Sequence, residues 1–78
     1  MNILPSESEV KAAIVLKVAM YAMEQSLERH ELDTAAIAAL NSYNDGMSPI
    51  VAVRVGMKAV AAITADKIIL TIRRGNHA

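Results

Sequence analysis

The stretch from Val10 to Met23, VKAAIVLKVAMYAM, most constrains the fold, because only Lys11 and Lys17 among its fourteen residues are charged. Drawn as a helix, it is apolar on most of its faces. Such a helix has to be covered by the rest of its own domain or by another chain. The chain has 78 residues, which predicts one small domain over residues 1–78 and leaves little chain to provide that cover. We therefore expect the protein to need a partner.

Two apolar rows run along this predicted helix, the first at the 3-4-3-4 spacing of a coiled-coil seam and the second beside it. The first row is Ala13, Leu16, Met20, Met23 and Leu27, and the second is Val10, Ile14, Val18 and Tyr21. We predict that the eight larger side chains of the two rows form an interface by burying apolar surface. On this interpretation, Met20→Glu or Leu16→Asp should abolish assembly and folding with it.

The composition favours self-association. The chain has no cysteine, phenylalanine or tryptophan, and 14 of its residues are alanine. Without disulfides or large aromatic side chains, a chain this short gains burial by close helix packing on alanine or by oligomerisation. We expect a homo-oligomer, most simply a dimer, or a complex with a partner protein. The absence of cysteine fits a reducing compartment, and residues 10–23 are too short for a membrane span, so we expect a cytoplasmic protein that does not enter the membrane.

The first half of the chain predicts two helices. Ser6, with Glu9 three residues later, is a capping-box signature, and the apolar pattern continues to about residue 30, so we predict a helix over 6–30. A second helix is predicted over 33–44, with Asp33 or Thr34 as its N-cap. Asn44-Asp45-Gly46 then marks a turn.

The second half is compatible with two structures. Ser48-Pro49 is a good helix start, and apolar residues continue at helical spacing, which predicts a third helix over 49–63. The segment IVAVRVG also alternates, however, and KIILTIRR alternates with Ile68, Leu70 and Ile72 on one side. We favour a mainly α small bundle around the first helix, in which 67–74 forms a short fourth helix. The alternative is an α+β fold, with two helices on a small antiparallel sheet formed by 50–63 and 67–74.

Catalytic and metal-binding arrangements are not evident, so we predict no enzyme activity, cofactor or metal site. The only histidines are His30, expected at the solvated end of the first helix, and His77. The three glycines are too far apart to form a phosphate-binding loop. Glu24, Glu28 and Glu31 would share one helix face, where we expect a solvated acidic stripe.

Charge is unevenly distributed although the formal net charge is zero. Residues 1–45 carry a net charge of −4 and residues 46–78 a net charge of +4. This pattern indicates that the halves attract one another within the chain or between subunits, and it also offers a basic surface for an anion. The candidate anion contacts are Arg54, Lys58, Lys67, Arg73 and Arg74.

These observations predict a non-enzymatic protein–protein interaction module, such as an adaptor, chaperone, inhibitor or regulatory subunit, that works through the apolar face of its first helix. The alternative is a dimeric nucleic-acid-binding regulator that uses the basic C-terminal half. The helix predicted after residue 48 has almost no side chains that could read base edges, which weakens that alternative.

Overall fold

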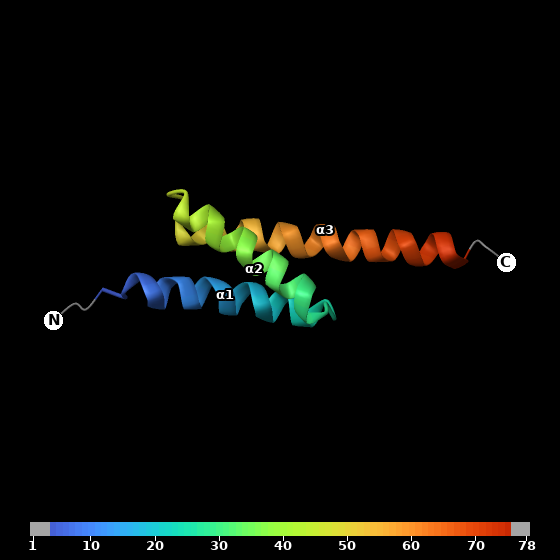
Figure 1. The fold of residues 1–78 in the computed structure, drawn as a ribbon, viewed down its shortest axis with the longest axis horizontal. Helices are drawn as coiled ribbons and strands as arrows, with labels where there is room; N and C mark the ends of the chain where they lie inside the picture. The colour runs from blue at the N-terminus through green and yellow to red at the C-terminus, as the bar shows by residue number, and fades with distance from the viewer. Residues whose placement is uncertain (1–3, 76–78) are drawn as a thin grey trace.

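The computed structural model describes residues 4–75 and contains three helices there: α1 (Glu7–Glu24), α2 (Arg29–Asn44) and α3 (Pro49–Gly75). α2 runs back across α1 and α3, which point in the same direction (Figure 1). The mainly α prediction is confirmed, and no strand occurs within the described range. The α+β alternative, with a sheet formed by 50–63 and 67–74, is therefore wrong.

α1 is shorter than the predicted 6–30 helix. It begins as expected, because the Ser6 hydroxyl accepts a hydrogen bond from the Glu9 N–H at 3.3 Å. It ends at Glu24 because Ser26 adopts a left-handed conformation, with φ of 58°. The N–H of Leu27 then donates to the carbonyl of Ala22, and the N–H of Ser26 to that of Met23. This is a Schellman motif, which satisfies the last carbonyl groups of a helix and turns the chain away.

α2 begins at Arg29, four residues before the predicted start, so Asp33 and Thr34 do not cap it. Glu28 is the N-cap residue, and its N–H donates to Glu31 Oε1 at 2.9 Å. Leu27 and Leu32 flank this cap and both pack against the core, as in a hydrophobic staple. The end of α2 was predicted correctly, because Gly46 has φ of 99° and closes a second Schellman motif.

α3 starts at the predicted position, where the Val51 N–H donates to the Ser48 hydroxyl at 3.3 Å, but it continues without a break to Gly75. Residues 67–74 therefore form neither a strand nor a separate fourth helix. The physical reason is that a lone strand has no partner for its backbone groups, whereas a continued helix satisfies them internally. Thr71 also fits the helix, since its hydroxyl donates to the Lys67 carbonyl at 2.9 Å.

Small side chains dominate the core. Its fully buried large side chains are only Ile14, Val18 and Val60, and alanines supply most of the rest. The three helices approach one another closely at Gly56 of α3. A Cβ atom there would lie 3.0 Å from the Cβ of Ala39 and closer still to Val18 Cγ2. Close packing on alanine and glycine is thus how this short chain buries its interior.

The molecule is long and thin, with principal extents of 65 × 20 × 16 Å. Its Cα radius of gyration is 15.3 Å, whereas a compact domain of this length has about 11.5 Å. α3 causes most of the difference, because its C-terminal part continues beyond the end of α1 (Figure 1).

Candidate functional site: an exposed apolar surface

The two apolar rows of α1 have opposite environments. In the second row, Ile14 and Val18 are 1% and 0% exposed and pack in the chain's own core, with Val10 and Tyr21 partly buried beside them. Ile14 and Val18 are therefore structural, whereas Val10 and Tyr21 stay only partly covered.

The first row faces away from the core. Leu16, Met20 and Met23 are 59%, 55% and 67% exposed, and Ala13 is exposed as well. Leu27 departs from this row because α1 ends before it, and it packs against the core from the turn. The exposed side chains are not needed to fill the interior, so the expectation that Leu16→Asp or Met20→Glu would abolish folding does not follow from the structure.

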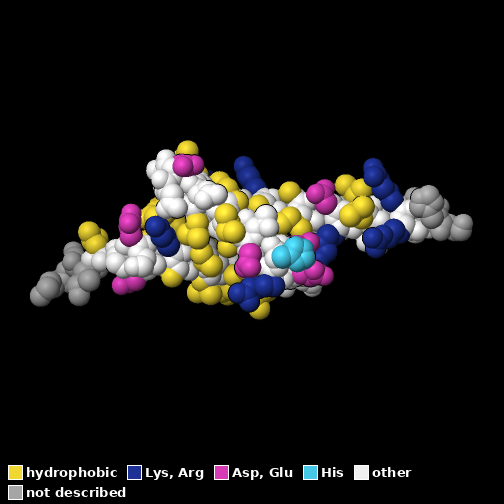
Figure 2. All heavy atoms as spheres, viewed as in Figure 1, with side chains coloured by type: hydrophobic (Ala, Val, Ile, Leu, Met, Phe, Trp, Pro, Cys, Tyr) yellow, Lys and Arg dark blue, Asp and Glu magenta, His cyan; other side chains and the backbone are white. Residues whose placement is uncertain are grey.

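Exposed large apolar side chains also occur on the other helices. On α2 the example is Ile37, and on α3 they occur at both ends: Ile50 and Val51, then Ile68, Ile69, Leu70 and Ile72. The space-filling view shows apolar side chains spread along much of the visible surface (Figure 2). The described residues therefore expose more large apolar side chains than they bury.

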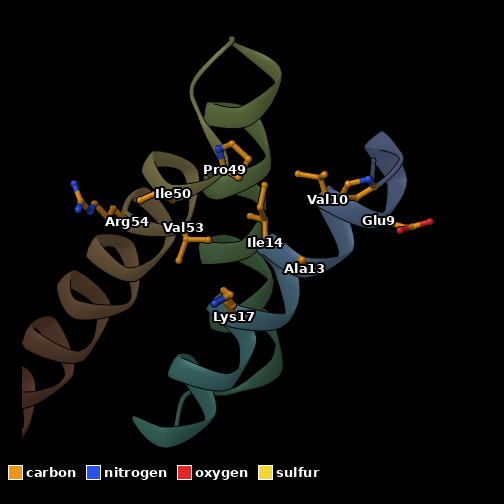
Figure 3. A pocket seen from close by; sticks show the side chains of 10 residues that line it. Glu9, Val10, Ala13, Ile14, Lys17, Pro49, Ile50, Val53 and Arg54 are labelled. Carbon is orange, nitrogen blue, oxygen red and sulfur yellow. The ribbon is translucent and has the colours of Figure 1, made fainter. Parts of the chain in front are cut away.

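An apolar groove of about 690 Å³, here called the N-terminal groove, separates the first turns of α1 and α3. Val10, Ala13 and Ile14 form its α1 wall, and Ile50 and Val53 form its α3 wall (Figure 3). Its outer end lies near Pro5 and Glu9, while Lys17 lies farther along α1. In Figure 3 these side chains lie in front of α2, so the groove opens on the side of the molecule opposite that helix.

The last part of α3, residues 68–75, projects beyond the other two helices and is exposed throughout. We call it the α3 extension. Ile68 and Ile72 lie on one flank of it and border a smaller hollow beside Gln25 and Ser26 at the end of α1. Leu70 lies two residues from both Ile68 and Ile72. Two residues turn a helix by about 200°, so Leu70 lies on the face opposite these two isoleucines.

The five predicted anion contacts do not form a single patch. All lie on α3, and the rise from Arg54 to Arg74 is about 30 Å. Arg54 and Lys58 share one face, and Arg73 and Arg74 lie in the last turn, where the helix dipole favours basic groups. Lys67 is engaged within the molecule, because its Nζ donates to Glu31 Oε1 at 3.0 Å.

The ends of the molecule differ in charge. Acidic side chains gather around the start of α1, where Glu7 and Glu9 lie in the first turn, and basic side chains gather around the α3 extension (Figure 2). The charge asymmetry seen along the sequence therefore becomes a difference between two ends of an elongated molecule.

Sequence reasoning missed the role of Glu31, which it placed on an acidic stripe of the first helix. The carboxylate of Glu31 accepts hydrogen bonds from the Glu28 N–H and from Lys67 Nζ, and both lower the pKa of Glu31 below its ordinary value. Among the ion pairs of residues 4–75, this is the one that joins two helices. The sequence does contain a pattern that indicates a helix start here. Glu28 and Glu31, three residues apart and flanked by Leu27 and Leu32, form a variant of the capping box.

The structure offers no arrangement for metal chemistry in its described part. Groups of three or more His, Asp or Glu side chains that could hold a metal ion do not occur there. His30 lies in the first turn of α2, not at the end of α1, and its Nδ1 is 3.4 Å from a Glu28 carboxylate oxygen. His77 lies outside the described residues. None of the three helices combines the length and apolarity needed to cross a membrane within residues 4–75.

Comparison of the chain with protein-family models, curated proteins and solved structures finds no match. Function is therefore inferred from the residues and geometry of this chain.

Proposed function

We propose that this chain is a non-enzymatic interaction module that self-associates through the exposed apolar side chains of α1. The observation that supports this most strongly is the division of its apolar rows. In the second row Ile14 and Val18 are buried in the chain's own core, while Leu16, Met20 and Met23 of the first row are all more than half exposed. A large exposed apolar patch on a small protein typically marks an interaction site.

The exposed row has the chemistry of a helix-packing surface. Ala13, Leu16, Met20 and Met23 follow the 3-4-3 spacing at which two helices interlock side chains. Methionine is flexible and adapts well to a partner surface. Burying large apolar side chains here would contribute roughly 1.5–3 kcal/mol each to association.

Nucleic-acid binding receives less support from the geometry. The basic residues proposed to contact nucleic acid are spread along the length of α3. One of them, Lys67, forms an ion pair with Glu31. The first turn of α3 carries the exposed apolar side chains of Ile50 and Val51, where a recognition helix would carry polar ones.

Mass measurement in solution over a dilution series tests the proposal. We expect the wild-type chain to form an oligomer that dissociates on dilution. Leu16→Asp and Met20→Glu should each yield a folded chain whose dissociation constant is raised at least about tenfold, because a charge would be buried at the contact.

Ile37→Asp is the matched control, because Ile37 is also about half exposed, at 57%, but lies on α2. It should leave the dissociation constant within about threefold of the wild-type value. A wild-type chain that stays monomeric at millimolar concentration would contradict the proposal.

A further inference from the structure

We propose that in the self-associated form the α3 extension of each chain lies in the N-terminal groove of a second copy, so that two chains pair end for end. This inference rests on the proposed function and adds where the copies touch and how they are oriented. The juxtaposition that carries it is an apolar groove at one end of the molecule and an unpartnered apolar helix at the other.

The two surfaces match in chemistry. The walls of the groove present Val10, Ala13, Ile50 and Val53, and the buried Ile14 also lines it. The α3 extension presents Ile68 and Ile72, one helical turn apart on a single flank. Seating these isoleucines in the groove would cover apolar surface on both copies.

The two surfaces also match in length and position. The eight residues of the α3 extension span about 12 Å, and the α1 wall from Glu9 to Lys17 has about the same rise. Because the groove and the extension lie at opposite ends of a 65 Å molecule, a two-fold axis across the long axis brings each extension to the other copy's groove. Figure 1 shows α1 ending well before α3, and Ile68 and Ile72 of the extension remain more than half exposed beside the end of α1.

Charge selects the direction of docking. In this arrangement the tip of the extension, with Arg73 and Arg74, reaches the outer end of the partner copy's groove, near Glu7 and Glu9. The reverse direction would place the two arginines beside Lys17, which lies farther along the groove. Complementary charges of this kind fix orientation and suppress wrong pairings.

The elongated chain exposes more surface than a compact domain of its mass. The chain exposes 5861 Å², whereas a compact monomer of 8.4 kDa exposes about 4,600 Å². The excess, about 1,200 Å², is larger than the roughly 800 Å² that each partner buries in a standard interface.

Substitutions on opposite sides of the extension test the contact. Sedimentation equilibrium over a dilution series would measure the dimer dissociation constant. We expect Ile68→Asp and Ile72→Asp each to raise it at least about tenfold, and Leu70→Asp, on the opposite face, to change it by less than about threefold. Circular dichroism should show the wild-type helix content for all three, because these side chains are exposed in the single chain.

Charge reversal tests the direction. Arg73→Glu with Arg74→Glu should raise the dissociation constant about tenfold at low salt, and Glu7→Arg with Glu9→Arg should do the same. A chain carrying all four reversals should recover most of the wild-type affinity, because the attraction is restored with opposite sign. Association that stays as weak as in the half-reversed chains would overturn the proposed register.

The outcomes separate this inference from the proposed function. A wild-type chain that never associates contradicts both. An oligomer that Leu16→Asp disrupts, but that Ile68→Asp and Ile72→Asp leave intact, supports the proposed function and overturns the docking of the extension. A dissociation constant equally sensitive to Leu70→Asp and Ile72→Asp would also overturn it, because the contact would not be confined to one flank.

Discussion

Residues 49–67 and residues 68–75 belong to one continuous helix, but their surroundings are opposite. The first part packs against both other helices through Ala52, Gly56 and Val60, all buried. The second part has no buried residue and carries four exposed large apolar residues: Ile68, Ile69, Leu70 and Ile72. Small residues of α3 are thus buried in the core, while many of its large apolar side chains are exposed.

The fold depends on how closely three helices approach one another at alanine and glycine, more than on the total apolar volume of the sequence. The large side chains that this packing does not use remain available to another molecule.

The largest effect is expected at Gly56 of α3, which closely approaches Val18 of α1 and Ala39 of α2. Gly56→Val should lower the free energy of unfolding by about 3 kcal/mol, because the new side chain would overlap Val18 and Ala39. This is a large share of the stability of a domain this size, roughly 4–12 kcal/mol. Urea unfolding followed by circular dichroism would measure the change.

Gly75→Val is the matched control within the same helix. A Cβ atom at Gly75 has nothing within 4 Å, so the substitution should leave the unfolding midpoint close to that of the wild type. Equal midpoints for the two variants would show that Gly56 is not a point of close approach.

A moderate effect is expected from truncating large side chains in the two parts of α3. Val60→Ala should destabilise the fold by about 2 kcal/mol, because Val60 is fully buried and its loss leaves a cavity. Ile69→Ala should cost less than about 0.5 kcal/mol, because that side chain is half exposed. Thermal unfolding at one protein concentration would compare the stabilities of the two variants. A larger loss of stability for Ile69→Ala than for Val60→Ala would mean that residues 68–75, and not residues 49–67, form the packed part of α3.

The smallest effect is expected at the boundary between the two parts, where Lys67 meets Glu31. The hydrogen bonds from Glu28 and Lys67 lower the pKa of Glu31 in the folded chain, so the unfolded chain binds the proton more readily. The stabilisation should therefore be fully present above the ordinary pKa of a glutamate, about 4.3, and should be lost as the pH falls through the lowered value.

Glu31→Gln removes this titration. The free energies of unfolding of wild type and variant, measured with urea, should differ most at neutral pH. They should converge toward about pH 2–3, below the ordinary glutamate pKa. A difference that is constant across this range would mean that the Glu31 carboxylate contributes no pH-dependent stability.

The sequence predicted the number and type of the first three elements and several of their ends. Ser6, Ser48 and Gly46 have strong local preferences, for N-caps and for a left-handed turn, and each acts as predicted. Ser26 has no such preference. Its left-handed backbone is held by the turn that brings Leu27 and Leu32 onto the core, which is why the predicted 6–30 helix was too long.

For the candidate site, the sequence indicated that one apolar row could be buried within the chain and the other left exposed, but not which row is which. Val10, Ile14, Val18 and Tyr21 are as apolar as Leu16, Met20 and Met23, so helical spacing alone makes both rows candidates for burial. The groove and the α3 extension were not predicted either, because both depend on where α1 ends relative to α3.

The sequence by itself determined a helical chain with more apolar surface than so few residues can cover. Only the tertiary structure decided which surface is covered. The close approach of Val18, Ala39 and Gly56 fixes the rotation of α1, which buries the second row and leaves the first exposed. The physical reason is that periodicity reports how apolar side chains are spaced along a helix, whereas the direction they face depends on contacts with residues distant in the chain.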